Sequence, residues 1–127
     1  MRSRCLLVAT LLLAGCVGEP PPPSETPPAA IEVTIRTAPG DKLAFEPAVS
    51  TVRATGPISL IFHNGSSVAH NMTFTAGVEA GTNTIVRPGA SERILLAPPL
   101  PGAYPFVCTI HDGMAGRLIV EPASARQ

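Results

Sequence analysis

Residues 108–114 read Cys-Thr-Ile-His-Asp-Gly-Met, and they lie between two short segments with the composition of β-strands. The preceding segment, 103–108, and the following one, 117–121, are rich in β-branched or aromatic residues and have a glycine close before them. The loop between them carries a thiol, an imidazole and a thioether at intervals of three residues. We therefore expect a strand, a short loop with three soft or borderline metal donors, and a second strand.

The same strand pattern recurs from residue 31 to residue 122. In segment 31–36 apolar residues alternate with polar or charged ones, as they do in a half-buried strand. Breaks rich in glycine and proline separate the segments, and no stretch has the period of a helix. We expect strands at 31–36, 43–45, 49–54, 58–62, 70–75, 93–97, 103–108 and 117–121. This spacing predicts an all-β fold, a Greek-key β-sandwich of seven to eight strands.

The beginning of the chain has the layout of a secretory signal. Arg2 and Arg4 precede an apolar run that is too short to span a bilayer and ends in Leu-Ala-Gly-Cys at positions 13–16. These four residues resemble the lipobox of bacterial lipoproteins, in which the signal is cut before the cysteine and the cysteine is acylated. The resemblance implies a signal peptide at 1–15 and a lipid on Cys16. An ordinary secretory signal with an incidental cysteine is the alternative.

A proline-rich segment separates Cys16 from the expected domain. Residues 16–30 contain six prolines, a composition that favours extended polyproline II and makes a semi-rigid linker. We expect the globular domain at 31–122 and a short tail at 123–127. The domain would then lie outside the cytoplasm, in the cell envelope, tethered to a membrane through the lipid.

Cysteine and histidine are scarce, which narrows the choice of site. Of the three cysteines, Cys5 would leave with the signal and Cys16 would carry lipid, so Cys108 is the one thiol of the domain. Without other context it could be a buried, inert hydrophobe. The chain has three histidines, too few for the additional catalytic coppers of a multicopper oxidase or a copper nitrite reductase.

A thiolate, two imidazoles and a weak axial thioether are the ligand set of a blue copper site. Cys108, His111 and Met114 supply three of these groups. His70 is the best candidate for the second imidazole, since it opens an expected strand after a Gly-Ser-Ser loop. A structural zinc site is a poor match, because it would not select a methionine.

With these residues the sequence resembles the cupredoxins, the small blue copper proteins that include plastocyanin, pseudoazurin and amicyanin. The resemblance extends over about 45–121, and the Cys-x2-His-x2-Met spacing is most similar to that of amicyanin. It rests on three features: the pair His70-Asn71, the series Cys108, His111 and Met114, and the closing segment 116–121.

The resemblance implies the role of each residue and the function. Three ligands would surround one copper in a plane and a fourth would lie on the axis: His70, Cys108, His111 and, on the axis, Met114. Asn71 would hydrogen-bond to the ligand loop near Thr109. The protein would be an electron carrier and not an enzyme, passing single electrons between a donor and an acceptor protein in transient contacts. Electrons would leave through an apolar patch with His111, Gly113 and the 98–101 loop.

Other residues and other functions compete with this interpretation. We expect His63 to be an exposed residue at a strand end and Met72 to pack in the core beneath the site. A copper chaperone or storage protein outside the cytoplasm is the alternative function, and a metal-free adhesion or assembly module is a third. Nine basic and nine acidic residues give a net charge of zero, which argues against nucleic acid binding and strong electrostatic steering. We expect a monomer.

Overall fold

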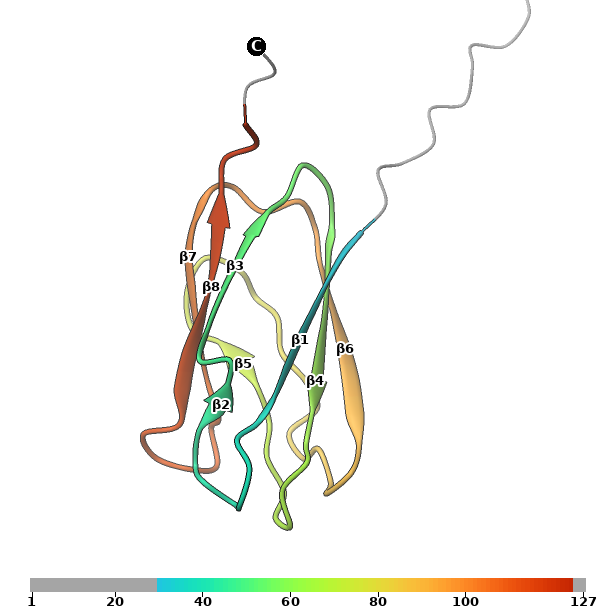
Figure 1. Cartoon of the computed structure of the whole chain (residues 1–127), viewed down its shortest axis with the longest axis vertical. Helices are drawn as coiled ribbons and strands as arrows, with labels where there is room; N and C mark the ends of the chain where they lie inside the picture. Colours follow the sequence, from blue (N-terminus) through green and yellow to red (C-terminus); the bar gives the residue numbers. More distant parts are fainter. Residues whose placement is uncertain (1–29, 125–127) are drawn as a thin grey trace, which may run out of the picture.

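A computed structural model of the chain describes residues 30–124, and eight strands in this range form two sheets (Figure 1). The strands are β1 (Ile31–Thr37), β2 (Phe45–Glu46), β3 (Val49–Arg53), β4 (Ile58–His63), β5 (Thr73–Phe74), β6 (Ser91–Leu96), β7 (Gly102–Val107) and β8 (Ala115–Glu121). The predicted all-β sandwich of seven to eight strands is confirmed. The segment 1–29, with Cys16 and the expected signal, lies outside the described residues.

The chain crosses repeatedly between the two sheets. One sheet has the order β2-β1-β4-β6 and the other has the order β3-β8-β7-β5. β1 is parallel to β4, and β3 is parallel to β8, although neither pair is consecutive in the chain. Because β3 belongs to the second sheet, the path from β1 to β4 passes through both layers. The connections between consecutive strands therefore link the two sheets into one sandwich.

The core between the sheets is organised around the four phenylalanines of the chain. The Phe45 ring packs edge-on against Phe62 of its own sheet and, at a centroid distance of 5.0 Å, against Phe106 of the other sheet. Phe106 also packs edge-on against Phe74. Edge-to-face aromatic pairs add stability beyond the burial of their area. The cluster thus joins β2 and β4 to β5 and β7.

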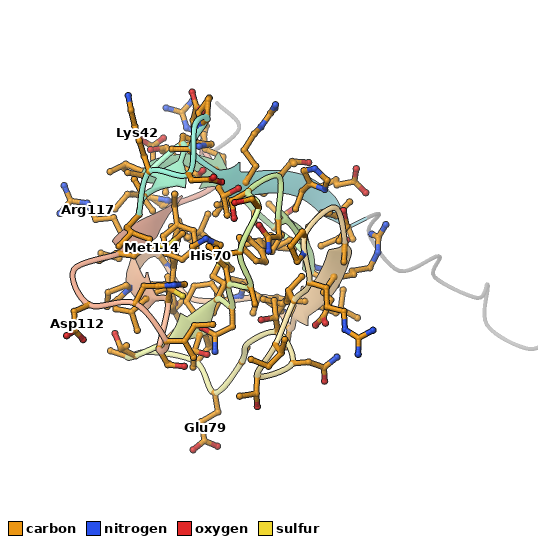
Figure 2. The ribbon with its side chains drawn as sticks, turned by 90° about the horizontal axis from the view of Figure 1, so that it is seen from below. Lys42, His70, Glu79, Asp112, Met114 and Arg117 are labelled. Carbon is orange, nitrogen blue, oxygen red and sulfur yellow. The ribbon has the colours of Figure 1, made fainter. Side chains whose placement is uncertain are left out.

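The candidate ligands gather at one pole of the sandwich. β1, β4 and β7 end at this pole, which is the lower end in Figure 1, and the first residue of β1 lies at the other end. Figure 2 looks onto this pole, with His70 and Met114 toward its middle and Asp112 at its edge. The strand arrangement therefore brings the loops before β5 and before β8 to the same end.

Two expectations about the chain path are wrong. The segment 70–75 is not one strand, because β5 has only two residues and His70 lies outside it in an isolated bridge with Val86. The backbone of Met72 instead bonds to the 80–82 segment that follows. The 98–101 loop joins the end of β6 to the start of β7, and since β6 runs away from the site, this loop lies at the opposite pole. It cannot contribute to a patch around His111.

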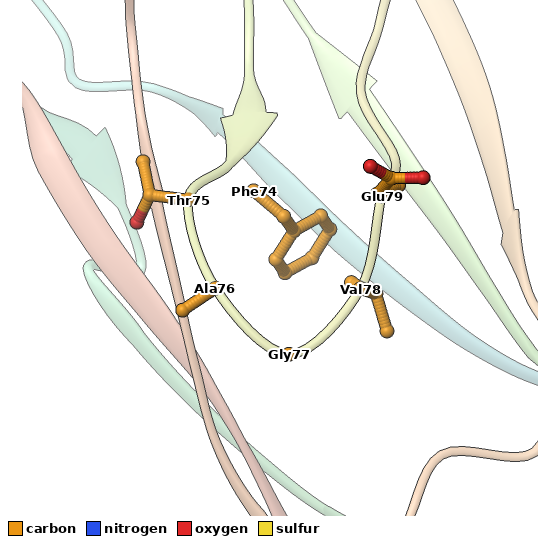
Figure 3. A pocket seen from close by; sticks show the side chains of 6 residues that line it. All are labelled: Phe74, Thr75, Ala76, Gly77, Val78 and Glu79. Carbon is orange, nitrogen blue, oxygen red and sulfur yellow. The ribbon is translucent and has the colours of Figure 1, made fainter.

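The loop after β5 curves around an open surface hollow of about 510 Å³ (Figure 3). The Phe74 ring lies within the curve of this loop. Gly77 stands at its tip with a φ of 83°, and an added Cβ there would lie 2.7 Å from the Tyr104 ring. Glu79 is the one ionisable residue among the six that line the hollow. The hollow therefore offers no converging set of donor atoms.

Within residues 30–124 the chain forms no helix that is both long and apolar enough to cross a membrane.

Candidate metal centre

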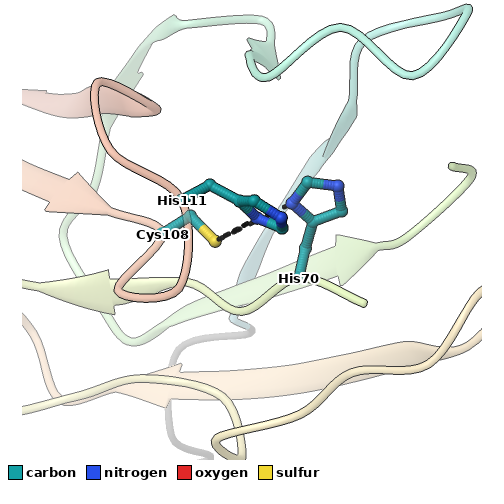
Figure 4. A group of neighbouring side chains, drawn as sticks. All are labelled: His70, Cys108 and His111. Carbon is teal, nitrogen blue, oxygen red and sulfur yellow. Dashed lines mark hydrogen bonds between the residues drawn. The ribbon is translucent and has the colours of Figure 1, made fainter. Parts of the chain in front are cut away.

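Three side chains from two distant segments converge at the pole (Figure 4). His70 precedes β5, Cys108 directly follows β7, and His111 lies in the loop between β7 and β8. One ligand atom from each of the three lies within 4.8 Å of the others. The Sγ of Cys108 is 3.7 Å from Nδ1 of His70 and 3.5 Å from Nδ1 of His111. Both imidazoles therefore present the same nitrogen to the sulfur.

These separations fit two donors that share one ion. For metal–nitrogen and metal–sulfur bonds of about 2.0 and 2.3 Å, the lengths found for zinc, an angle of about 120° separates the two donor atoms by about 3.7 Å. The observed distances from Cys108 to His70 and to His111 are 3.7 and 3.5 Å. The sulfur is thus at a distance from each imidazole nitrogen that suits shared coordination of one metal ion.

The ligand loop is short and closed by its own backbone. The amide nitrogen of Cys108 donates to the carbonyl of Met114 over 2.9 Å, which brings the two ends of the loop together. Gly113 has a φ of 78°, a conformation that glycine adopts without strain and that reverses the chain before Met114. Met114 is 1% exposed, so its thioether is buried beneath the loop. The loop therefore keeps Met114 in the interior, with its backbone hydrogen-bonded to Cys108 and His111.

His70 is fully buried, and its environment favours the neutral ring. Burial lowers the pKa of His70, the nearby His111 lowers it further, and the carboxylate of Asp41 opposes this shift. A metal binds the neutral imidazole, so the shift prepares His70 as a ligand. The other ring nitrogen, Nε2, is buried and has no hydrogen-bond partner among the described residues. Nδ1 is the nitrogen that faces the cluster.

Asn71 connects the His70 segment to the ligand loop. Its Nδ2 donates to Oγ1 of Thr109 over 2.7 Å, and its Oδ1 accepts from the backbone nitrogen of Thr109 over 2.7 Å. Nδ2 also donates to the carbonyl of Thr84 over 3.1 Å. Asn71 is 2% exposed, so these bonds are shielded from water. The residue after His70 is thus hydrogen-bonded to the residue after Cys108.

The remaining histidine lies outside the cluster, and the second buried methionine belongs to the core. His63, at the end of β4, is half-buried rather than exposed, and its Nδ1 pairs with Oγ of Ser91 over 2.8 Å. Met72 is 0% exposed and belongs to the hydrophobic core. His63 is not in the three-donor group of His70, Cys108 and His111.

Two polar side chains that the sequence patterns did not single out organise the loop before His70. Asn64 is fully buried and hydrogen-bonds to three other residues, and Asp41 accepts two hydrogen bonds from Ser67 across the pole. The sequence around Asn64 contains a recognisable turn signal. Asn64 stands at the end of a strand before Gly-Ser-Ser, where asparagine often caps a turn with its own side chain.

Residues 4–120 match the family described as the cupredoxin-like domain. Solved structures of this fold include auracyanin B, which is 27% identical over 78% of this chain and 93% of that chain, with a TM-score of 0.63. A reduced amicyanin variant is 28% identical over 78% and 95%, with a TM-score of 0.56. A reduced auracyanin from the photosynthetic bacterium Roseiflexus castenholzii is 24% identical over 74% and 99%, with a TM-score of 0.61. Among curated proteins, none matches the chain significantly.

The fold and the donor set define a small copper protein of the β-sandwich class. Two imidazoles, a thiolate and a buried thioether are the composition of a type 1 copper site, and copper is the cofactor that they fit. The chain belongs to the cupredoxin-like family. The predicted family and cofactor are confirmed.

Proposed function

We propose that this chain is a membrane-tethered blue copper protein that carries single electrons between two redox partners. One observation supports this most: the Cys108 sulfur lies 3.5 Å from Nδ1 of His111 and 3.7 Å from Nδ1 of His70, which is 38 residues away in the chain, and these distances suit one shared metal ion. Copper changes by one electron between Cu(I) and Cu(II), and a donor set held by the protein changes little between the two states. With the Cys108 thiolate and both imidazoles engaged by copper, the chain would act as a carrier and not as an enzyme.

Each ligand has a distinct role in this proposal. The nitrogens of His70 and His111 and the sulfur of Cys108 would lie in the plane around copper. Met114 would approach along the axis as a weak, long contact, which helps to set the reduction potential. Asn71 would keep the ligand loop closed by its two hydrogen bonds to Thr109.

Electrons would enter and leave through His111. It is half-buried, whereas the other two donor residues of the cluster are buried. Around the same pole, the loops expose apolar side chains at Leu43, Val68 and Ile110. A small apolar surface suits a brief contact with a partner protein, because such contacts bury little area. With a net charge of zero, the chain would rely on this surface more than on electrostatic steering.

The tether would direct the site away from the membrane. The chain enters the domain at Ile31, and this end of β1 lies at the pole opposite to the candidate ligands (Figure 1). Residues 19–30, extended as polyproline II, would hold the domain about 30–40 Å from a lipid anchor at Cys16. An extracytoplasmic location is typical of cupredoxins and agrees with the proposed lipid anchor. The domain would act as a monomer and expose the copper pole to its partners.

Addition of one equivalent of Cu(II) to the domain tests the electron-carrier proposal. The expected result is an intense visible band from charge transfer between the Cys108 thiolate and Cu(II), which disappears on reduction and returns on oxidation. Repeated cycles without loss of copper support a carrier. A pale adduct that releases copper to a weak chelator would instead indicate a chaperone or storage protein. An absence of binding would leave a metal-free β-sandwich.

The tether has a separate test in the complete chain. Cells that express the wild type or Cys16→Ser are labelled with radioactive palmitate, and the membrane fraction is recovered. We expect label in the wild type and none in the variant. Cys5→Ser is the matched control and should keep its label. Equal label in the wild type and in Cys16→Ser would contradict the lipid anchor.

A further inference from the structure

Asn64 directly follows β4, six residues before His70, and it is fully buried. Its Nδ2 donates to two carbonyl groups, those of Val68 and Val86, over 2.8 Å each. Its Oδ1 accepts from the backbone nitrogen and from Oγ of Ser66, each over 3.0 Å. One amide side chain thus uses both donor hydrogens and both acceptor sites, which is its full capacity.

One of these partners is also bonded to a candidate copper ligand. The carbonyl of Val86 accepts from Nδ2 of Asn64 and, over 3.1 Å, from the backbone nitrogen of His70. In return, the backbone nitrogen of Val86 donates to the carbonyl of His70 over 2.8 Å. Asn64 and the His70 backbone are therefore attached to the same peptide group in the interior.

From these contacts we propose that Asn64 is a positioning residue for the copper site and fixes His70 through the Val86 carbonyl. The inference rests on the proposed function and adds a residue to it. His70 precedes the two-residue strand β5, and its backbone pairs only in an isolated bridge. A regular ladder therefore does not hold this ligand. Asn64 supplies the missing support, because it fixes both the 64–68 turn and the residue with which His70 pairs.

An apolar residue could not replace this side chain at low cost. It would leave the buried backbone N–H of Ser66 without its acceptor, and the carbonyls of Val68 and Val86 would each keep only one of their two donors. Aspartate has the shape of asparagine but lacks the two N–H donors. Asn64→Asp therefore removes the bonds to Val68 and Val86 while it fills the same space.

Asn64 and Asn71 act on opposite sides of His70. Asn71 attaches the His70 segment to Thr109 of the ligand loop, and Asn64 attaches it to Val86. The two asparagines thus connect Val86, His70 and the loop with Cys108 in one hydrogen-bonded frame. Such a frame holds the imidazole in one place while the copper changes its oxidation state.

The test compares three variants of the copper-loaded domain. Asn64→Asp removes the two donors, and Ser66→Ala loosens the same cluster more mildly, since Oγ of Ser66 donates to Asn64 and Val68. Leu96→Ala is the control, because Leu96 is buried at the end of β6 at the opposite pole. The readouts are Cu(II) affinity, the relative intensities of the visible bands, the copper hyperfine splitting in electron paramagnetic resonance, and the reduction potential.

We expect Asn64→Asp to bind Cu(II) about tenfold or more weakly, with altered band intensities, hyperfine splitting and potential. Ser66→Ala should change the same signals in the same direction by a smaller amount. Leu96→Ala should lower the free energy of unfolding and leave the spectrum and the potential at their wild-type values. Wild-type signals in both Asn64→Asp and Ser66→Ala would overturn the inference. If Asn64→Asp does not fold, the result for Ser66→Ala decides.

A measurement without copper separates this inference from the proposed function. Hydrogen exchange at the backbone nitrogen of His70 reports the bond to Val86 directly. In the copper-free domain, exchange there should be about tenfold or more faster in the variants of the Asn64 cluster than in Leu96→Ala at matched stability. Equal rates would overturn the positioning role. A wild type that forms no blue complex would contradict the proposed function, whatever the exchange rates are.

Discussion

Asn71 and Thr109 are joined by two hydrogen bonds of 2.7 Å, one in each direction between the asparagine amide and the threonine. The two residues are 38 positions apart, the same separation as His70 and Cys108. Each is the neighbour of a candidate ligand in the chain. The pair therefore sets the distance between the two segments that carry the copper donors.

Removal of this link should weaken both the fold and the metal site. Asn71→Ala loses all three side-chain hydrogen bonds of the residue and should lower the free energy of unfolding by about 1–3 kcal/mol. Copper affinity should fall about tenfold or more. Thr109→Val removes only the hydroxyl and keeps the backbone donor, so its effects should be smaller. Urea unfolding and transfer of copper to a chelator measure them, and equal effects in the two variants would contradict this account.

Cys108→Ser should abolish the blue colour while the sandwich stays folded. Serine is close in size to cysteine and Cys108 is 4% exposed, so the packing changes little. The intense visible band needs a thiolate, and a hydroxyl is a poor ligand for copper. Visible absorption and circular dichroism of the variant with one equivalent of Cu(II) provide the measurement. A variant that remained blue would exclude Cys108 as the ligand.

The axial position can be assigned by two methionine variants. Met114→Gln replaces the thioether by a harder oxygen donor that favours Cu(II), so the reduction potential should fall while the blue colour remains. Met72→Leu nearly conserves volume and should cost less than about 1.5 kcal/mol of stability, with little change in potential. Voltammetry on both variants gives the answer. A potential that changes with Met72 and not with Met114 would show that the axial assignment is wrong.

Gly116 should tolerate no side chain. An added Cβ would lie 2.5 Å from the Phe106 ring and 2.7 Å from the carbonyl oxygen of Ala48. Because this phenylalanine belongs to the aromatic cluster, Gly116→Ala should destabilise the domain by about 1–3 kcal/mol. Gly102→Ala is the matched control, since its nearest contact there is an ordinary 3.9 Å to Tyr104. Thermal unfolding of the two variants should therefore differ, and equal midpoints would contradict the packing argument.

The carboxylate of Asp41 should make stability depend on pH in the acid range. Hydrogen bonds from the backbone nitrogen of Ser67 and then from its hydroxyl lower the pKa of Asp41 below its usual value. The ionised form is thus favoured by folding. The stabilisation is complete above the unfolded pKa of about 3.9 and is lost as the pH falls through the lower folded pKa.

The copper-free domain and Asp41→Asn are to be compared by thermal unfolding from pH 7 to pH 3. The wild type should be more stable at pH 6, and its advantage over Asp41→Asn should shrink below about pH 4. Glu79→Gln removes one carboxylate from another loop of the molecule and serves as the control for net charge. A difference between the wild type and Asp41→Asn that stays constant with pH would rule out the Ser67 contact as its cause.

The sequence by itself determined the fold class, the family and the candidate ligands. These rest on local patterns: the alternation in β1, the glycine and proline breaks, and the spacing of Cys108, His111 and Met114. A period of two residues and a loop of seven residues depend on neighbours in the chain, so they are readable without the fold.

Only the tertiary structure decided how distant segments meet. The convergence of His70 with Cys108, the buried bonds of Asn64 and the short length of β5 depend on strand order and register. The prediction that the 98–101 loop lies near His111 is wrong for the same reason. The composition of this loop does not determine at which pole of the sandwich β6 ends. Hydrogen bonds and metal geometry are set by distances across the sandwich, and these follow from the packing of the two sheets, which no local pattern encodes.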